Sequence, residues 1–337
     1  MILVTGAAGH LGNVLCRELT KRGEQVRALV LPGERLTSLE GLPVERFEGN
    51  ILNPEELSRA TEGIDLVYHM AGLVDITPDR YEVMRRVNVD GTRNVIDACR
   101  ENGVGRLVYT SSIHALERPP LGTIVDERLR FDVDNPSGMY DRTKAKASVL
   151  VLEAVKQGLD AVIVAPTGVI GPYDFNRSEM GRMLLSWTRK GLALTVEGAY
   201  DFVDVRDVAL GHILAAEKGK RGEVYLLGGE KVTVVQIQEM AQAVVGIKNH
   251  RMYAPTWLAR LIAPVAEFYT RLTHTRPILT KYAIETLQSN ANISHQKAVN
   301  ELGWKPRPLK ESVKDTVEWF QENLRSTQAG LRTDSLQ

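Results

Sequence analysis

Short apolar runs alternate with longer stretches of helical periodicity along most of the chain up to Gly228. The first run, Ile2 to Val4, is followed by apolar residues at helical spacing between Leu11 and Leu19. Strands that alternate in this way with amphipathic helices are typical of an α/β fold with a doubly wound parallel sheet, whose ligands lie beyond the carboxyl ends of the strands. The further strands that we predict are Val26–Leu31, Val44–Phe47, Asp65–His69, Arg106–Thr110, Ala161–Ala165 and Glu223–Leu227.

Three glycines follow the first strand at the spacing GxxGxxG, as Gly6, Gly9 and Gly12. A strand, a glycine turn and a helix start together direct unpaired backbone N–H groups and the positive end of the helix dipole toward a phosphate. Gly6 is predicted to make the turn, Gly9 to let the backbone approach a pyrophosphate, and Gly12 to let the helix pack closely on the strand. The sequence therefore predicts a dinucleotide site in a Rossmann-type sheet.

Beyond Gly228 the alternation fades into mostly helical sequence, which predicts a smaller C-terminal substrate domain. An apolar stripe there, Trp257 to Leu272, is expected to pack against the sheet domain with a kink at Pro264, and a position on a membrane surface is the alternative. The predicted dinucleotide-binding domain comprises 1–165 and 203–228, the substrate or lid domain comprises 166–202 and 229–325, and the polar tail 326–337 is expected to be disordered.

Composition argues against several classes of function. The 337 residues are 43% hydrophobic and include 42 basic and 42 acidic side chains, without the Lys/Arg run that would indicate nucleic-acid binding. Cys16 and Cys99 fall within helical patterns, and two isolated cysteines form neither a disulfide framework nor a metal site. The first strand begins at Met1, and no apolar stretch approaches the ~18 residues that span a bilayer, so we expect a cytoplasmic protein without an integral membrane segment.

The segment GMYDRTKAKA contains Tyr140 and Lys144 at a spacing that places a phenol and an ammonium on one face of a helix. An unperturbed tyrosine ionises near pH ~10 and is too weak an acid to protonate a developing alkoxide efficiently at neutral pH. A nearby cation lowers that pKa, because a unit charge ~4 Å away at an effective dielectric constant of about 20 contributes about 4 kcal/mol. The pair therefore indicates a proton donor whose pKa is adjusted toward neutrality.

Several motifs follow the glycine turn in a fixed order, namely DLVYHMAG at 65–72, NVDGT at 88–92, YTSS at 109–112, YDRTK at 140–144 and PTGVIGP at 166–172. With these motifs the chain resembles an extended short-chain dehydrogenase/reductase over nearly its whole length. The resemblance implies that Tyr140 is the general acid and base, and that Lys144 binds the nicotinamide ribose and lowers the pKa of Tyr140. It also implies that Ser112 hydrogen-bonds the substrate oxygen and that Asn88 completes the polar group.

The branches of this superfamily differ at positions that can be read in the sequence. Nucleotide-sugar epimerases usually carry Asn and Arg at two positions used on the diphosphate, where this chain has Gly168 and Tyr200. Sugar dehydratases place an acidic pair where this chain has Ile113 and His114. PTGVIGP is more similar to the dihydroflavonol-reductase and 3β-hydroxysteroid-dehydrogenase branch, whose substrates are largely apolar alcohols and ketones. Side chains that would suit such a pocket, or simply form a core, are Met139, Met180, Met183, Leu184, Trp187 and Phe202.

The end of the second strand lacks both usual determinants of cofactor choice. Val30 and Leu31 stand where an Asp would bind the ribose hydroxyls of NAD, or a following Arg the 2′-phosphate of NADP. Arg35 in the next loop favours NADP, whereas Glu34 favours NAD, which remains the alternative. Asn50 replaces the Asp that usually contacts adenine, and its carbonyl can accept the same hydrogen bond. The other residues expected at the dinucleotide are His10, Leu11, Ile51, Ala71, Gly72, Pro166 and Thr167, together with Tyr140 and Lys144.

The helix that continues beyond Lys144 is apolar around most of its circumference, whereas a helix lying on a sheet needs only one apolar stripe. Relatives in the resembled superfamily pair this helix and the preceding one across a two-fold axis, which implies a homodimer. Coverage by the lid domain of the same chain is the alternative. The apolar residues concerned are Ala145, Ala147, Val149, Leu150, Val151, Leu152, Ala154 and Val155, with Val89, Val95, Ile96 and Ala98 on the preceding helix.

Taken with the resemblance, these features predict an NAD(P)-dependent oxidoreductase that transfers hydride between the nicotinamide and a carbonyl or secondary alcohol of a small, mainly apolar substrate. A nucleotide-sugar epimerase that uses the same polar residues is one alternative. A catalytically silent dinucleotide sensor or assembly protein is another, although relatives of that kind often lack the tyrosine or the lysine. The identity of the substrate, the direction of the reaction and its stereochemistry stay open.

Overall fold

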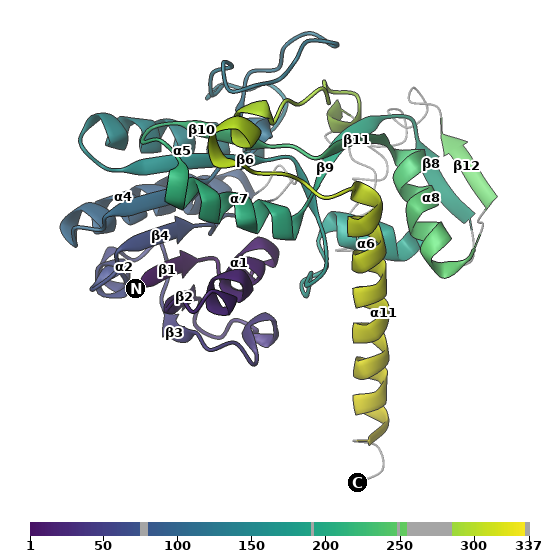
Figure 1. Ribbon diagram of the computed structural model, residues 1–337, viewed down its shortest axis with the longest axis horizontal. Coiled ribbons are helices and arrows are strands. Elements are labelled where there is room, and N and C mark those ends of the chain that lie inside the picture. The colour runs from purple at the N-terminus through teal and green to yellow at the C-terminus, as the bar shows by residue number, and fades with distance from the viewer. Residues whose placement is uncertain (75–79, 190–191, 248–249, 255–284, 334–337) are drawn as a thin grey trace.

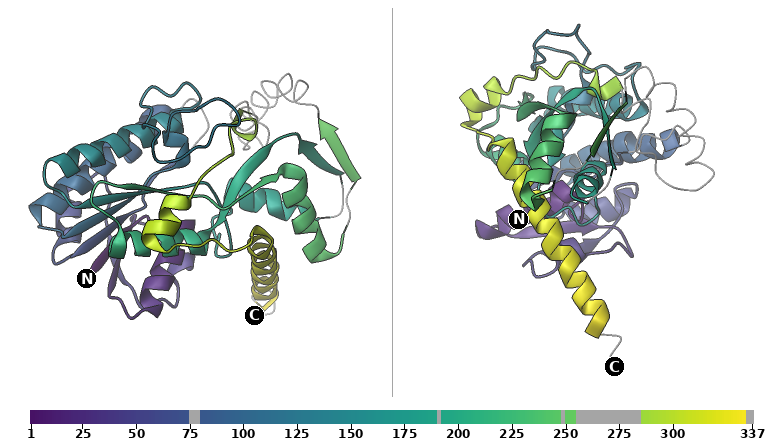
Figure 2. Two further views of the ribbon diagram at one scale, coloured as in Figure 1. Left: turned by 45° about the horizontal axis from the view of Figure 1, so that its top comes forward. Right: turned by 90° about the vertical axis from the view of Figure 1, so that its right-hand side faces the viewer.

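A seven-stranded parallel sheet with helices on both faces forms the larger part of the molecule, and a smaller group of strands and helices adjoins it (Figures 1 and 2). The structure is a computed structural model. It describes residues 1–74, 80–189, 192–247, 250–254 and 285–333.

The strands of the large sheet pair in parallel in the order β10-β6-β5-β4-β1-β2-β3, which confirms the predicted fold class. The order reverses between β1 and β4, and doubly wound sheets bind their ligands beyond the carboxyl ends of the strands at such a reversal. The strands are β1 (Ile2–Thr5), β2 (Val26–Val30), β3 (Glu45–Glu48), β4 (Leu66–His69), β5 (Arg106–Thr110), β6 (Ala161–Pro166) and β10 (Val224–Leu227).

The residues of β1 explain why the sheet is covered on both faces. Leu3 and Val4 are both fully buried, and successive side chains of a strand point to opposite faces. Val4 lies in the core beneath α1 and α7, and Leu3 lies in the core beneath α2, α4 and α5. The helical elements of this part are α1 (His10–Lys21), η1 (Thr37–Leu39), α2 (Pro54–Thr61), α3 (Tyr81–Arg85), η3 (Arg86–Asp90), α4 (Gly91–Glu101), η4 (Ile113–Ala115), α5 (Met139–Lys156) and α7 (Val205–Lys218).

The smaller part contains strands as well as the helices that its sequence predicts. A three-stranded sheet has the order β11-β9-β7, and β12 pairs with β8. Apolar side chains of α6, β9, α8 and α11 form a separate core between these elements. The elements are β7 (Gly168–Ile170), α6 (Glu179–Trp187), β8 (Leu192–Val196), β9 (Ala199–Asp204), β11 (Glu230–Thr233), α8 (Val234–Val245), β12 (His250–Ala254), η5 (Ala298–Leu302) and α11 (Leu309–Thr333).

The sequence predicts an apolar stripe and a disordered tail in the C-terminal region. The apolar stripe from Trp257 to Leu272, with Pro264, lies outside the described residues. The expectation of a disordered tail differs from the structure up to Thr333, because α11 continues to that residue and leads away from the body of the molecule (Figure 1). Once a helix is nucleated, each added residue gains one backbone hydrogen bond, so a polar continuation without proline can remain helical. Among the described helices, none is both long and apolar enough to cross a membrane.

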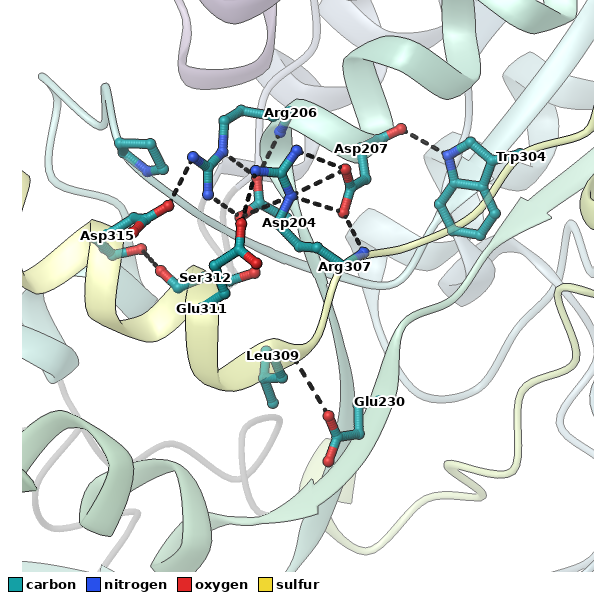
Figure 3. Close-up of polar contacts among 12 residues, drawn as sticks. Asp204, Arg206, Asp207, Glu230, Trp304, Arg307, Leu309, Glu311, Ser312 and Asp315 are labelled. Atoms are coloured by element: carbon teal, nitrogen blue, oxygen red, sulfur yellow. Dashed lines mark hydrogen bonds and ion pairs between the residues drawn. The ribbon is translucent and has the colours of Figure 1, made fainter.

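A cluster of ion pairs fastens the start of α7 to the segment that leads into α11 (Figure 3). The Arg307 guanidinium contacts the Asp207 carboxylate at 2.8 Å, and the backbone N–H of Arg307 donates to the same carboxylate at 2.7 Å. Arg206 bridges Asp204 and Asp315, at 2.7 Å from each. Because the carboxylates of Asp204 and Asp207 are buried, their pairing with arginine is needed to offset the free energy of dehydrating them. The cluster therefore fixes α11 relative to the large sheet.

Cys16 and Cys99 are buried in the two cores of the large sheet and are not joined in a disulfide, as the sequence predicts. Burial raises the pKa of each thiol to about 12. Both side chains are therefore protonated at neutral pH and act as small apolar core residues.

Candidate active site

The glycine turn after β1 has the geometry that its spacing predicts. Gly6 has φ +68°, a left-handed conformation that favours glycine, and a Cβ there would lie 2.7 Å from the backbone nitrogen of Ala71. A Cβ on Gly12 would collide with the carbonyl oxygen of Gly6. The turn therefore brings the end of β1, the start of α1 and the segment after β4 into close contact.

The start of α1 fits the pyrophosphate of a dinucleotide. Gly9 is the N-cap residue, and no side chain caps the helix there, so its first N–H groups point toward the space beyond the strands. A Cβ on Gly9 would lie 3.1 Å from the Gly6 carbonyl oxygen. Glycine at this position therefore keeps the turn open for a bound phosphate. His10 Nε2 lies 3.0 Å from the Pro172 carbonyl oxygen, so the segment after β7 lies against the first turn of α1.

The residues expected at the adenosine end lie in the loops after β2 and β3. Arg35 lies in an exposed turn after β2. The Glu34 carboxylate accepts a hydrogen bond from Leu31 N at 3.0 Å, which places a negative charge at the end of that strand. Asn50 Oδ1 accepts from Leu52 N at 2.9 Å and keeps a second lone pair for a ligand. Ile51 is 6% exposed and packs in the core beneath α2 and α4.

Lys144 lies at the carboxyl ends of the central strands and is only 6% exposed. Its ammonium donates to the Thr110 carbonyl oxygen and lies 4.7 Å from the centroid of the Tyr109 ring. Burial lowers the pKa of Lys144 to about 7, because little water remains to stabilise the charged form. The ammonium is thus held by a carbonyl dipole and an aromatic face, both neutral groups.

Tyr140 lies one helical turn before Lys144 on α5 and is close to Ser112, which follows β5. Burial raises the pKa of Tyr140 to about 12, and a hydrogen bond with Ser112 acts in the opposite direction. This shift is opposite to the one that we expected from Lys144. The reason is that burial of the phenol dominates, while the Lys144 ammonium is directed to the Thr110 carbonyl. The phenol is therefore protonated at neutral pH.

Asn88 lies in η3 and is 1% exposed. Its Oδ1 accepts from Leu73 N at 2.7 Å, and its Nδ2 donates to Leu73 O and to Thr143 Oγ1, each at 3.0 Å. A Cβ on Gly72 would lie 3.3 Å from Asn88 Oδ1 and 3.8 Å from Lys144 Nζ. Asn88 therefore holds the segment after β4 against α5, and the absence of a side chain on Gly72 lets that segment lie close to Lys144.

A hydrogen-bonded chain centred on His69 joins the glycine turn to Asn88, and the sequence analysis did not identify it. Thr92 Oγ1 donates to the Asn88 carbonyl oxygen at 2.6 Å, so it accepts from His69 Nε2 at 3.0 Å. His69 Nδ1 then accepts from Thr5 Oγ1 at 2.7 Å, and Thr5 Oγ1 accepts from Ala71 N. Burial lowers the pKa of His69 to about 3, which keeps the ring neutral. A histidine at the end of a buried strand was the signal that could have indicated this chain.

Two further contacts on the substrate side also escaped the sequence analysis. His114 Nε2 lies 2.6 Å from Tyr200 Oη, although the two residues are far apart in the sequence. Asp141, next to Tyr140, is fully buried and pairs with Arg118 at 2.8 Å. Both contacts lie beside Tyr140, and neither His114 nor Asp141 belongs to a pattern that periodicity or spacing distinguishes.

The remaining predicted residues lie where the strands end. Pro166 closes β6, and Thr167 N donates to the Leu227 carbonyl oxygen at 3.2 Å. Of the side chains proposed for an apolar pocket, Leu184, Trp187 and Phe202 are buried in the core of the smaller part, with Met180 and Met183 packed against it. Most of that set therefore forms core, the alternative that the sequence left open.

The arrangement combines a protonated phenol, a serine hydroxyl and a buried ammonium at the edge of the sheet where its strand order reverses. A phenol that keeps its proton at neutral pH is a donor to an oxygen that gains negative charge. A hydroxyl beside it stabilises such an oxygen by a second hydrogen bond. The group is therefore suited to proton transfer at a carbonyl or alcohol oxygen next to a bound dinucleotide.

Comparison with known proteins shows the family to which the chain is similar. The NAD dependent epimerase/dehydratase family matches residues 2–228. The chain is 37% identical to sterol demethylase protein B of Methylococcus capsulatus, over 95% of this chain and 98% of that protein. It is 33% identical to a putative dihydroflavonol 4-reductase of Synechocystis, over 95% and 94% of the two chains. The crystal structure of gox2253 superposes with a TM-score of 0.83 at 32% identity, covering 96% of this chain and 98% of that one.

The low pKa of Lys144 makes the stability of the free protein depend on pH. Between the folded value of about 7 and the ordinary value of 10.5, the unfolded chain binds one more proton than the folded chain. The destabilisation therefore grows as the pH falls toward 7 and is constant below it. Lys144→Met removes it, so we expect the variant to gain about 1 kcal/mol or more relative to wild type between pH 10 and pH 7.

Urea unfolding of both proteins at the two pH values measures this difference. Lys146→Met, on the same helix, is the matched control for the removal of a lysine. A difference between Lys144→Met and wild type that stays the same at both pH values would contradict the lowered pKa.

Proposed function

The chain belongs to the NAD-dependent epimerase/dehydratase family, and from this we propose that it is an NAD(P)-dependent oxidoreductase acting on a carbonyl or secondary alcohol. The observation that carries the proposal is the convergence of Ser112, Tyr140 and Lys144 beyond the carboxyl end of β5, next to the strands where the sheet order reverses. This is the edge toward which the uncapped start of α1 also points.

We propose the following roles in the reducing direction. Tyr140 donates its proton to the substrate oxygen, because its raised pKa keeps the phenol protonated until the oxygen becomes more basic. Ser112 hydrogen-bonds the same oxygen and stabilises its developing negative charge. Lys144, one helical turn away, stabilises the phenolate that remains. The bound dinucleotide supplies or accepts the hydride.

The dinucleotide would be held by residues from five strand ends. The proposed cradle for its pyrophosphate is the glycine turn with the first N–H groups of α1. Asn88 supports this region by fixing the segment that contains Gly72. The proposed contacts are Gly6, Gly9, His10, Leu11, Gly12, Arg35, Asn50, Ile51, Ala71, Gly72, Tyr140, Lys144, Pro166 and Thr167. We also propose the predicted division into a dinucleotide-binding domain and a substrate domain. The substrate would then bind between the large sheet and the smaller part.

A mainly apolar substrate is favoured over a nucleotide sugar. The names of the two relatives refer to a sterol and to a dihydroflavonol reductase. Gly168 and Tyr200 stand at positions where nucleotide-sugar epimerases usually have Asn and Arg, and a diphosphate needs such charge-assisted donors. A silent dinucleotide sensor is disfavoured because Tyr140 and Lys144 are both present and lie one helical turn apart.

The proposed function is tested by incubating the pure protein with NADPH or NADH and a panel of ketones, aldehydes and nucleotide sugars. The reaction is monitored through the change in nicotinamide absorbance. We expect oxidation of the reduced nicotinamide with apolar ketones. Conversion of a nucleotide sugar to its epimer without net change in absorbance would establish the epimerase alternative instead.

The role of Tyr140 predicts the behaviour of Tyr140→Phe, which removes only the hydroxyl. We expect dinucleotide binding to persist while turnover falls by about 10²-fold or more, the range of general acid catalysis. The turnover of Ser112→Ala should fall less, because this change removes one of two hydrogen bonds to the substrate oxygen. Steady-state kinetics on an established ketone measures both, and near-wild-type turnover by Tyr140→Phe would refute the mechanism.

Cofactor preference gives a second prediction. We propose that NADP is preferred, since Arg35 is the first cation after the end of β2, although the Glu34 carboxylate opposes it. Arg35→Ala should then weaken NADPH more than NADH, because it removes a charge-assisted contact to the 2′-phosphate. Fluorescence titration gives both dissociation constants. Arg128→Ala is the control, since that side chain is 85% exposed. Equal changes in the dissociation constants of NADPH and NADH would show that Arg35 does not contact the 2′-phosphate.

We also propose that the protein is a homodimer formed through α4 and α5. These helices pack against each other, and Leu150, Leu152 and Val155 of α5 stay only half-buried in the single chain. A partner copy would complete their burial, and each fully buried aliphatic side chain contributes ~1.5–3 kcal/mol. Light scattering after size exclusion at micromolar concentration should give twice the chain mass of 37.4 kDa. A mass equal to that of one chain would exclude a stable dimer.

A further inference from the structure

His114 and Tyr200 form a pair of rings beside the proposed proton donor. His114 lies in η4, directly after Ser112, and Tyr200 lies in β9 of the smaller part. Their hydrogen bond is 2.6 Å long, and the rings are stacked with centroids 5.8 Å apart and planes 11° apart. A single contact thus joins the end of the large sheet to the three-stranded sheet.

The pair is placed by its neighbours on both sides. Ser112 Oγ accepts a hydrogen bond from His114 N at 3.2 Å, which fixes the turn that carries the imidazole. The imidazole meets the Tyr140 ring edge-on, with centroids 6.4 Å apart. Tyr200 is only 7% exposed, whereas His114 is half-buried, so His114 is the member of the pair that a ligand can reach.

The ring of Tyr200 fills the space that a side chain at position 168 would need. A Cβ on Gly168 would lie 2.8 Å from Tyr200 Cε1 and 2.7 Å from Phe202 Cδ1. The ring of Phe202 also meets that of Tyr200 edge-on, at 5.4 Å. A larger residue at 168 therefore requires the ring of Tyr200 to move. The two positions at which an epimerase carries its diphosphate ligands are filled here by one packed aromatic side chain.

The pair carries no charge at neutral pH. Burial raises the pKa of Tyr200 and lowers the pKa of His114, so the phenol stays protonated and the imidazole stays neutral. Arg118, the neighbouring cation, is paired with the buried Asp141 carboxylate at 2.8 Å. Dehydrating a diphosphate beside neutral rings would be strongly unfavourable, whereas an uncharged apolar surface loses little on contact with them.

We propose that His114 is a specificity-determining residue that contacts the part of the substrate next to the reacting carbonyl, and that Tyr200, seated on Gly168, is its positioning residue. Together they select uncharged ketones or alcohols and reject nucleoside diphosphates. The inference rests on the proposed oxidoreductase function and assigns the residues that set its substrate class.

The first test is Tyr200→Phe, which keeps the ring and removes the hydroxyl that His114 contacts. With decalone as an uncharged ring ketone, we expect KM to rise about 10-fold and kcat to change less than about 3-fold, because a net hydrogen bond of ~1.4 kcal/mol corresponds to tenfold in affinity. His114→Phe should raise KM at least as much, because it also removes the proposed substrate contact, and the double variant should raise KM no further than His114→Phe does. Tyr225→Phe, which removes another tyrosine hydroxyl that bonds Glu301 at 3.0 Å, is the matched control.

The second test is calorimetric titration with UDP-glucose at saturating dinucleotide, which needs no turnover. Wild type should bind UDP-glucose at least 10-fold more weakly than decalone, and Tyr200→Arg should bind UDP-glucose at least 10-fold more tightly than wild type. The proposal is overturned if wild type binds UDP-glucose as tightly as decalone, or if Tyr200→Phe behaves as Tyr225→Phe does. Absence of ketone turnover in wild type would instead refute the oxidoreductase function, and the titration would still decide whether the pair rejects a diphosphate.

Discussion

The buried ammonium of Lys144 is the constraint on which the centre of this protein depends. A charge that is 6% exposed is tolerated only where the groups around it offer dipoles and bring no second positive charge. The Thr110 carbonyl and the Tyr109 ring face supply the dipoles. His69 and His212 lie close enough for the Lys144 charge to lower their pKa values, although burial is the larger cause for both. Hydrogen bonds to Thr5, Thr92, Thr110 and the Val208 carbonyl hold these histidines in place.

Buried hydrogen bonds also connect the glycine turn to Asn88, one of the proposed catalytic residues. The chain from Ala71 through Thr5 and His69 to Thr92 ends on the carbonyl of Asn88, whose side chain in turn fixes the segment after β4. Buried hydrogen bonds therefore connect the glycine turn to Asn88 and, through the Asn88 side chain, to Thr143, the residue before Lys144. Such networks are rigid when every member is satisfied, which suits a site that must hold a dinucleotide and a proton donor in fixed relation.

Strand β9 and the residues just beyond it carry contacts that join the smaller part to the large sheet. Near its start, Tyr200 bonds His114 beside Tyr140, and at its end Asp204 joins the ion-pair cluster with Arg206 and Arg307. One strand therefore sets both the proposed substrate wall and the position of α11. The wall is built from neutral rings, and the attachment is built from charges.

The sequence by itself determined the large sheet and the glycine turn. All seven strands lie within a residue or so of their predicted bounds, because short apolar runs and the conformational freedom of Gly6 are local properties. Only the tertiary structure decided the contact of His69 with Thr5 and that of His114 with Tyr200, which join residues 64 and 86 positions apart in the sequence. It also reversed the expected pKa shift of Tyr140 and placed Ile51 in the core. Burial and long-range contact depend on how distant elements pack, and no periodicity along the chain specifies that packing.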